Sequence, residues 1–228
     1  MNIRGVRAAL ILVFIFVSAF QISAQDKDFQ NWNEFTLEKK VSKKLSILLG
    51  EEFRFVNNAT QFDKLNSSVG GDYSFNKYIG IGVFYRYTFS RDIEDGNSQK
   101  HRIYTDLKLS YKFHRITASY RGRYQNQTTT AFHDQEGISN EQYLRNRIKI
   151  KYNVPKIPAT PYVEAEYYYC LNNPYGRFID RSRYTFGADY SLSKDFSVGL
   201  YYRVQIRRES FNKPLNSYIL GTTFDYKF

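Results

Sequence analysis

Apolar and polar residues alternate along most of the chain beyond residue 25. Between Ile79 and Phe89 every second residue is apolar, and the intervening positions include Gly80, Arg86 and Thr88. The same alternation recurs in the segments 45–55, 103–111, 144–152, 184–190, 196–206 and 220–228. A period of two places successive side chains on opposite faces of a strand. The pattern therefore predicts strands whose two faces meet different environments.

The length of these strands and the spacing of their connections favour a membrane barrel over a soluble sandwich. Several runs reach ten or more residues, which exceeds the usual globular strand and suits a tilted membrane crossing. Short turns are expected at 41–44, 76–77, 113–114, 154–161 and 193–195, and longer polar stretches at 57–62, 91–100, 125–141, 171–179 and 208–215. The predicted fold is all-β, a single antiparallel transmembrane β-barrel with short periplasmic turns and longer extracellular loops.

The pattern leaves the number of strands open. If Phe228 ends on the periplasmic side, counting back through the turns makes the segment 29–41 an eleventh strand that starts outside. Single-chain bacterial barrels normally have an even number of strands. Within a range of about 10–12 we therefore expect ten strands, if that first segment is not in the membrane, or twelve, if one strand is hidden. A third alternative is that residues 25–34 run through the lumen.

The amino terminus has the layout of a secretory signal peptide. Arg4 and Arg7 precede an apolar run over 8–20, and the small-residue site Ile22-Ser23-Ala24 follows. We expect a signal peptide over 1–24 and an outer-membrane β-barrel domain over 25–228.

The carboxyl terminus points to the same compartment. Phe224, Tyr226 and Phe228 occupy alternate positions and close the chain. This strand resembles the carboxy-terminal insertion signal of bacterial outer-membrane proteins. We therefore expect residence in the bacterial cell outer membrane, with outer-membrane lipid, lipopolysaccharide and, during insertion, the barrel assembly machinery as partners.

Composition agrees once the two faces are separated. The chain has 33 Lys and Arg against 22 Asp and Glu, 18% aromatic residues and one Cys, and its mean hydropathy is −0.55. This profile excludes a helical membrane protein, a disulfide-stapled domain and a disordered chain. Basic residues among aromatic ones can indicate nucleic-acid binding. Here the two sets lie on opposite strand faces and the chain is exported, so no nucleic-acid partner is expected.

The inward face is predicted to be basic toward the long loops. Its arginines could fill a narrow barrel by pairing across it, or they could contact an anion in the lumen. The residues concerned are Arg54, Arg86, Arg102, Arg121, Arg123, Arg145, Arg147, Arg183, Arg203 and Arg207.

Cross-strand charge pairs and ring contacts are also expected on this face. The shortest possible turns place Lys149 opposite Glu164, Arg147 opposite Glu166 and Asp106 opposite Arg121. Tyr104, Tyr168 and Tyr201 are expected to stack on lumen arginines.

Catalysis and metal binding have little support in the sequence. His133-Asp134, in the longest expected loop, is the one catalytic dyad the sequence offers, and adjacent loop residues rarely share a substrate. Three scattered His and the single Cys170 form no ligand cluster. No catalytic residue, metal or cofactor is expected.

A family resemblance covers essentially the whole mature chain. Trp32, the segment 37–46, the residues Glu51, Glu52 and Arg54, and the terminal Tyr226-Lys227-Phe228 resemble domain-of-unknown-function family 2490 (DUF2490). The resemblance implies an outer-membrane barrel and no particular activity. Two roles stay open: a narrow pore for a small solute or anion, whose identity is unknown, or a structural envelope protein. The alternative is an enzyme, or a barrel that binds a ligand or lipopolysaccharide at its extracellular rim.

Overall fold

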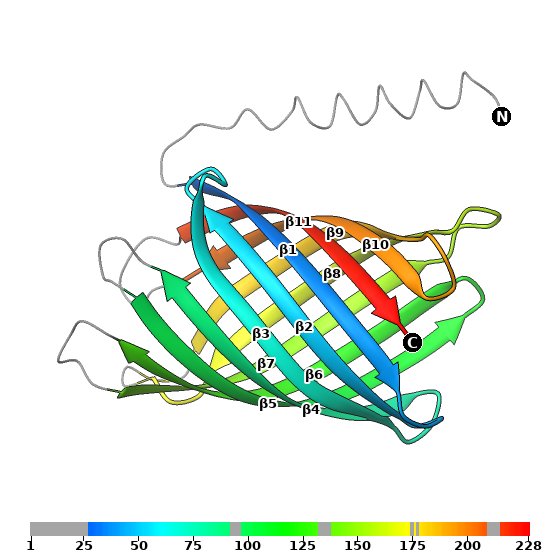
Figure 1. Ribbon diagram of the computed structural model, residues 1–228, viewed down its shortest axis with the longest axis horizontal. Helices are drawn as coiled ribbons and strands as arrows, with labels where there is room; N and C mark the ends of the chain where they lie inside the picture. Colours follow the sequence, from blue (N-terminus) through cyan, green and yellow to red (C-terminus); the bar gives the residue numbers. More distant parts are fainter. Residues whose placement is uncertain (1–26, 92–96, 132–137, 174–175, 177, 209–214) are drawn as a thin grey trace.

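The described chain folds into eleven strands, each hydrogen-bonded to the next along the sequence (Figure 1). The structure is a computed structural model, and it describes residues 27–91, 97–131, 138–173, 176, 178–208 and 215–228. The strands are β1 (Lys27–Lys40), β2 (Leu45–Val56), β3 (Gln61–Ser74), β4 (Ile79–Arg91), β5 (Asn97–Phe113), β6 (Ile116–Ala131), β7 (Ile138–Tyr152), β8 (Ala159–Cys170), β9 (Phe178–Ser191), β10 (Phe196–Arg207) and β11 (Leu215–Lys227).

The sheet closes on itself through a parallel seam. β1 pairs antiparallel with β2 and parallel with β11, with Trp32 opposite Gly221 in the parallel ladder. Every other neighbouring pair is antiparallel. A closed sheet leaves no edge with unpaired backbone groups.

The expected all-β barrel of about 10–12 strands is confirmed, but the preference for ten or twelve is wrong because the barrel has eleven. The sheet is antiparallel as expected except at the β1–β11 pair. The segment after residue 27 belongs to the wall as β1 and does not run through the lumen. An even count follows only when all neighbours are antiparallel, and the one parallel seam removes that requirement.

The two ends of the barrel differ in their connections. One end of the barrel, which we call the turn end, carries the carboxyl terminus and five short connections (Figure 1). These connections are 41–44, 75–78, 114–115, 153–158 and 192–195. The other end, the loop end, carries 57–60, 92–96, 132–137, 171–177 and 208–214. Connections at the loop end are shorter than the sequence indicated, because β5, β6 and β7 continue as strands for 17, 16 and 15 residues.

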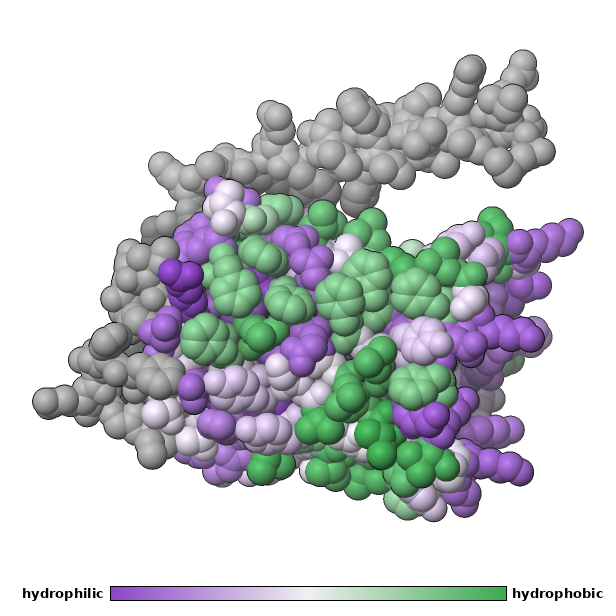
Figure 2. All heavy atoms as spheres, viewed as in Figure 1, coloured by the Kyte–Doolittle hydropathy of each residue, from purple (hydrophilic) through white to green (hydrophobic). Residues whose placement is uncertain are grey.

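The outer surface is an apolar belt with charged side chains beyond it. Exposed residues such as Val83, Ile103 and Leu200 are 55%, 62% and 56% accessible, a degree of exposure that lipid accounts for. Hydrophobic residues run across the middle of the visible face with some hydrophilic ones among them, and hydrophilic side chains project at the turn end (Figure 2). In the described part of the chain, no helix is long and apolar enough to cross a membrane.

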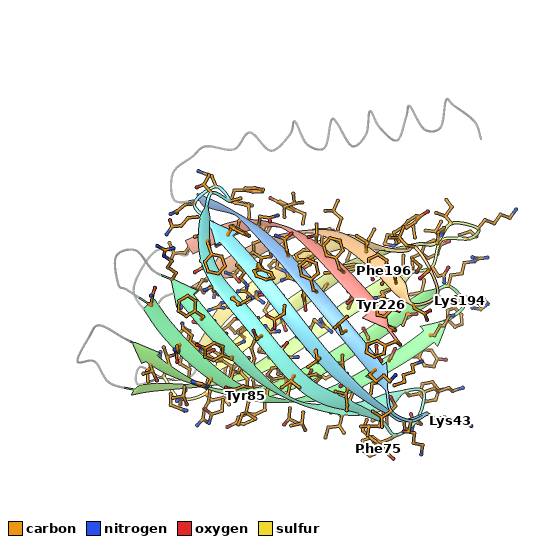
Figure 3. The ribbon with its side chains drawn as sticks, viewed as in Figure 1. Lys43, Phe75, Tyr85, Lys194, Phe196 and Tyr226 are labelled. Carbon is orange, nitrogen blue, oxygen red and sulfur yellow. The ribbon has the colours of Figure 1, made fainter. Side chains whose placement is uncertain are left out.

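Aromatic side chains border this belt. Phe75, Phe196 and Tyr226 lie near the turn end, with Lys43 and Lys194 beyond them, whereas Tyr85 lies in the other half of the barrel (Figure 3). Aromatic rings at this depth match the interfacial girdles of membrane barrels.

Candidate functional site: the arginine-lined lumen

The barrel encloses a cavity of about 760 Å³. Its lining reaches from Arg207 and Asn216 near the loop end to Asp72 and Lys108 near the turn end. This volume falls within the range of sites that hold small molecules.

All the arginines expected on the inward face line this cavity, and Arg181, which the sequence reasoning omitted, joins them. Arg181 has the same parity as Arg183 on β9, so the alternation could have found it. Fourteen Lys and Arg side chains and nine Asp and Glu side chains line the cavity. The lumen wall therefore has a surplus of positive charge.

Two of the three expected cross-strand pairings have the expected register. Lys149 lies opposite Glu164, and Arg147 lies opposite Glu166. The Lys149 ammonium is 3.9 Å from Glu164. Arg147, however, approaches Glu164 at 3.5 Å rather than its direct partner, because a long guanidinium side chain reaches diagonal neighbours as easily as direct ones.

The third expected pair is wrong. Asp106 lies opposite Arg123, not Arg121. The β5–β6 turn is His114-Arg115, one residue later than expected, and His114 adopts a φ of 51°. Shifting the centre of a hairpin by one residue moves every partner by two. Arg123 donates from Nε and Nη2 to the two Asp106 oxygens at 2.6 and 2.7 Å, a bidentate pair.

Glu166 is shared among three arginines from different strands. Arg145 donates to both of its oxygens at 2.9 and 3.0 Å, Arg121 contacts Oε1, and Arg183 lies 3.8 Å from Oε2. The Glu166 side chain is 3% exposed. One buried carboxylate thus holds together side chains from β6, β7 and β9.

A second group surrounds Glu52 near the seam. Arg54 is hydrogen-bonded to Glu52, Asn66 donates to Glu52 at 2.9 Å, and Arg86 lies 4.0 Å away. The Arg54 guanidinium also stacks on Trp32, 3.6 Å from the ring centroid. Trp32, Glu52 and Arg54 are among the residues that carried the family resemblance, and they lie together inside the barrel.

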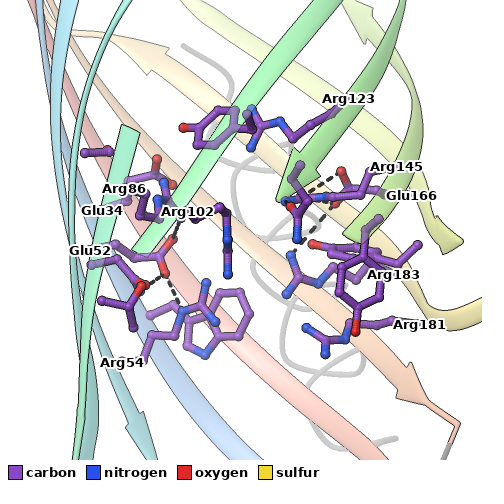
Figure 4. Close-up of a pocket in the computed structure, with 18 of the residues that line it drawn as sticks. Glu34, Glu52, Arg54, Arg86, Arg102, Arg123, Arg145, Glu166, Arg181 and Arg183 are labelled. Carbon is purple, nitrogen blue, oxygen red and sulfur yellow. Dashed lines mark hydrogen bonds and ion pairs between the residues drawn. The ribbon is translucent and has the colours of Figure 1, made fainter. Parts of the chain in front are cut away.

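Arg102 differs from the other buried arginines of the lumen. Its Nε donates to Gln127 at 2.9 Å, and Gln127 in turn donates to Glu141 at 3.0 Å. Among the described residues no carboxylate forms an ion pair with Arg102. Its side chain lies between the Glu52 group and the Glu166 group (Figure 4).

Aromatic rings lie along the lumen wall, and guanidinium groups stack on them. The guanidinium of Arg123 stacks on Tyr104 at 3.7 Å, that of Arg145 on Tyr168 at 4.1 Å and that of Arg203 on Tyr201 at 4.7 Å. The expected stacking of these three tyrosines is confirmed.

Two glycines let rings lie flat against the wall. An added Cβ at Gly187 would lie 2.7 Å from the Tyr162 ring, and one at Gly221 would overlap the Tyr201 ring. Tyr162, Tyr201, Trp32 and Ile219 form a buried cluster on this side of the barrel. The missing side chains allow large rings to occupy the wall rather than the open space.

Near the turn end, lumen lysines form one-to-one pairs with carboxylates. Lys108 donates to Asp72 at 2.6 Å, and Lys151 donates to Asp189 at 2.9 Å. These pairs neutralise the wall locally.

The remaining residues singled out in the sequence lie away from the cavity or outside the described chain. The signal peptide 1–24 and His133-Asp134 lie outside the described residues. Cys170 is buried beside Tyr143 and Phe178, and it does not line the cavity. Phe224 stacks on Phe35 at 4.9 Å, and Tyr226 and Phe228 are exposed on the lipid-facing side near the turn end.

A closed barrel with an apolar belt, aromatic girdles and a charged lumen defines the class: the fold is that of outer-membrane β-barrels and is porin-like. The chain belongs to the family described as "Protein of unknown function (DUF2490)", whose model matches residues 29–216.

One solved structure has a similar fold. A structure titled "NanC porin structure in rhombohedral crystal form" is similar at 13% identity and a TM-score of 0.55, over 88% of this chain and 99% of that one. The beta domain of the Bordetella autotransporter BrkA (10% identity, TM-score 0.47, 83% and 86% covered) and a bacterial polysaccharide outer membrane secretin (11%, 0.42, 81% and 73%) are more distant. No curated protein matches the sequence significantly.

Proposed function

We propose that the protein is a narrow, anion-preferring pore for small solutes in the bacterial cell outer membrane. The proposal rests on the cavity of about 760 Å³, whose lining has fourteen basic side chains and only nine acidic ones. Rings of Arg and Lys favour anions in a confined path, because the wall charge attracts anions and repels cations. The lumen has a transport role in this proposal, and no reaction is assigned to it.

The surroundings of the barrel follow from the same proposal. The turn end faces the periplasm and the loop end faces the exterior, where basic rim residues can meet lipopolysaccharide phosphates. The strand that ends in Phe224, Tyr226 and Phe228 serves as the insertion signal read by the barrel assembly machinery. The exposed aromatic rings of this strand support that role.

Planar-bilayer recordings test the pore. The purified, folded protein is inserted into a neutral bilayer under a potassium chloride gradient, and the reversal potential is measured. The expected result is a small conductance whose reversal potential shows chloride preferred over potassium. Absence of conductance, or a preference for potassium, contradicts the proposal.

A further inference from the structure

Arg86 and Arg102 form a like-charged pair on neighbouring strands of the lumen wall. They lie directly opposite each other in the β4–β5 ladder, and both side chains line the cavity. Like charges in directly opposite positions repel each other. The positive charges of Arg145 and Arg54 also repel the Arg102 guanidinium.

Two other pairs of opposed arginines in the lumen, both between β6 and β7, are neutralised by carboxylates. Arg123 faces Arg145 and Arg121 faces Arg147 in the β6–β7 ladder. The carboxylates of Asp106, Glu164 and Glu166 contact these four guanidinium groups. The wall thus supplies an acid wherever two arginines meet between β6 and β7.

The Arg86–Arg102 pair receives much less compensation. Glu52 is engaged by Arg54 and Asn66, and it reaches Arg86 only at 4.0 Å. Glu34 lies opposite Glu52 in the β1–β2 ladder, so both carboxylates are on the Arg86 side. The Nε of Arg86 is buried without a hydrogen-bond partner, and Arg102 has only the Gln127 amide oxygen among the described residues.

We propose that Arg86 and Arg102 bind the oxyanion group of a small solute, a carboxylate or a phosphate. This inference deepens the proposed pore function and rests on it for its biological meaning. Among the described residues Arg102 is a buried cation without a carboxylate partner, and Arg86 has only the distant one of Glu52. Burying a cation that is poorly compensated is costly, so an anion that enters between the two guanidinium groups relieves this penalty. Two guanidinium forks match the paired oxygens of a carboxylate or phosphate better than point charges do. Both side chains line the cavity, so an anion in the lumen can contact them.

The only tryptophan of the chain offers a direct readout. Trp32 lies in the lumen, stacked under Arg54, which belongs to the Glu52 group beside the site. Folded protein in detergent is titrated with inorganic phosphate, and separately with acetate, at constant ionic strength maintained with chloride. Tryptophan fluorescence and calorimetry are recorded together. At least one of the two oxyanions is expected to bind saturably, and chloride alone should not.

Three variants assign the binding to these residues. Arg102→Gln is expected to weaken the apparent affinity at least about tenfold, since a buried charge-assisted contact is lost. Arg102→Lys keeps the charge but loses the fork, so its affinity should be intermediate. Lys43→Gln removes one charge from an exposed turn and serves as the matched control, with unchanged affinity expected. Circular dichroism establishes that each variant is folded.

The outcomes separate this site from the pore itself. Absence of saturable binding by both probes, or equal affinities of wild type and Arg102→Gln, overturns the site even if the bilayer experiment shows anion preference. Saturable, Arg102-dependent binding without any conductance supports the site and overturns the pore.

Discussion

Near the turn end of the lumen, Lys108 and Lys151 each contact a single carboxylate. Nearer the loop end, Arg102 contacts no carboxylate of the described chain, and Glu166 is divided among three arginines. One-to-one pairs neutralise the wall and leave little field in the lumen. Shared and missing carboxylates leave a net positive field. The number of basic residues in the lumen therefore does not by itself locate an anion site. The balance of partners at each level of the barrel does.

The largest effect is expected from removing the shared carboxylate. Glu166→Gln leaves three buried guanidinium groups without their anion, and breaking such a contact costs about 3–5 kcal/mol. The measurement is equilibrium unfolding in urea with detergent-folded protein. A variant as stable as wild type would show that water in the lumen already solvates these arginines. The same variant should have a stronger anion preference in bilayers, because one negative charge has gone.

Disturbing the flat packing of Tyr201 should come next. In Gly221→Ala the added methyl overlaps the Tyr201 ring and pushes it away from the wall toward the lumen, with an overpacking cost of about 1–3 kcal/mol. Unfolding measurements should show the loss, and single-channel recordings should show a lower conductance. The control is Gly71→Ala, where the nearest neighbour of the added Cβ is the Ser46 carbonyl oxygen at 3.5 Å; an equal effect in both variants would contradict the argument.

The two levels of the lumen are expected to contribute unequally to anion selectivity. Arg102→Gln should lower the chloride-to-potassium permeability ratio severalfold, since it removes a charge that no wall carboxylate balances. The double variant Lys108→Gln/Asp72→Asn removes a balanced pair and should leave the ratio unchanged. Reversal potentials measure both. The comparison fails if the double variant changes the ratio more than Arg102→Gln does.

The smallest effect is expected for a single member of a turn-side pair. The side chains of Lys108 and Asp72 are 39% and 23% exposed, so solvent screens their attraction. Asp72→Asn should cost at most about 1 kcal/mol of stability. Urea unfolding beside Glu166→Gln gives the contrast directly, and a loss as large as that of Glu166→Gln would show that the turn side is as dry as the middle of the lumen.

The alternation along the chain was sufficient to predict the strands, their two faces and most of the cavity lining. Arg86, Arg102, Arg145 and Arg203 line the cavity as their parity indicates, because a strand sends successive side chains to opposite faces wherever it lies. Turn positions were less reliable. A one-residue error at His114-Arg115 was enough to pair Asp106 with the wrong arginine.

The all-β barrel, the lipid-facing belt and the basic inward face could be predicted without the fold, since they depend on local periodicity and residue type. The count of eleven strands and the parallel β1–β11 seam became visible only in the folded barrel, because closure depends on how distant strands meet. The folded barrel also shows that Glu166 serves three arginines and Arg102 has no carboxylate partner among the described residues. Long guanidinium side chains reach across strands and the lumen, so their partners are set by the curvature of the closed barrel rather than by neighbours in sequence.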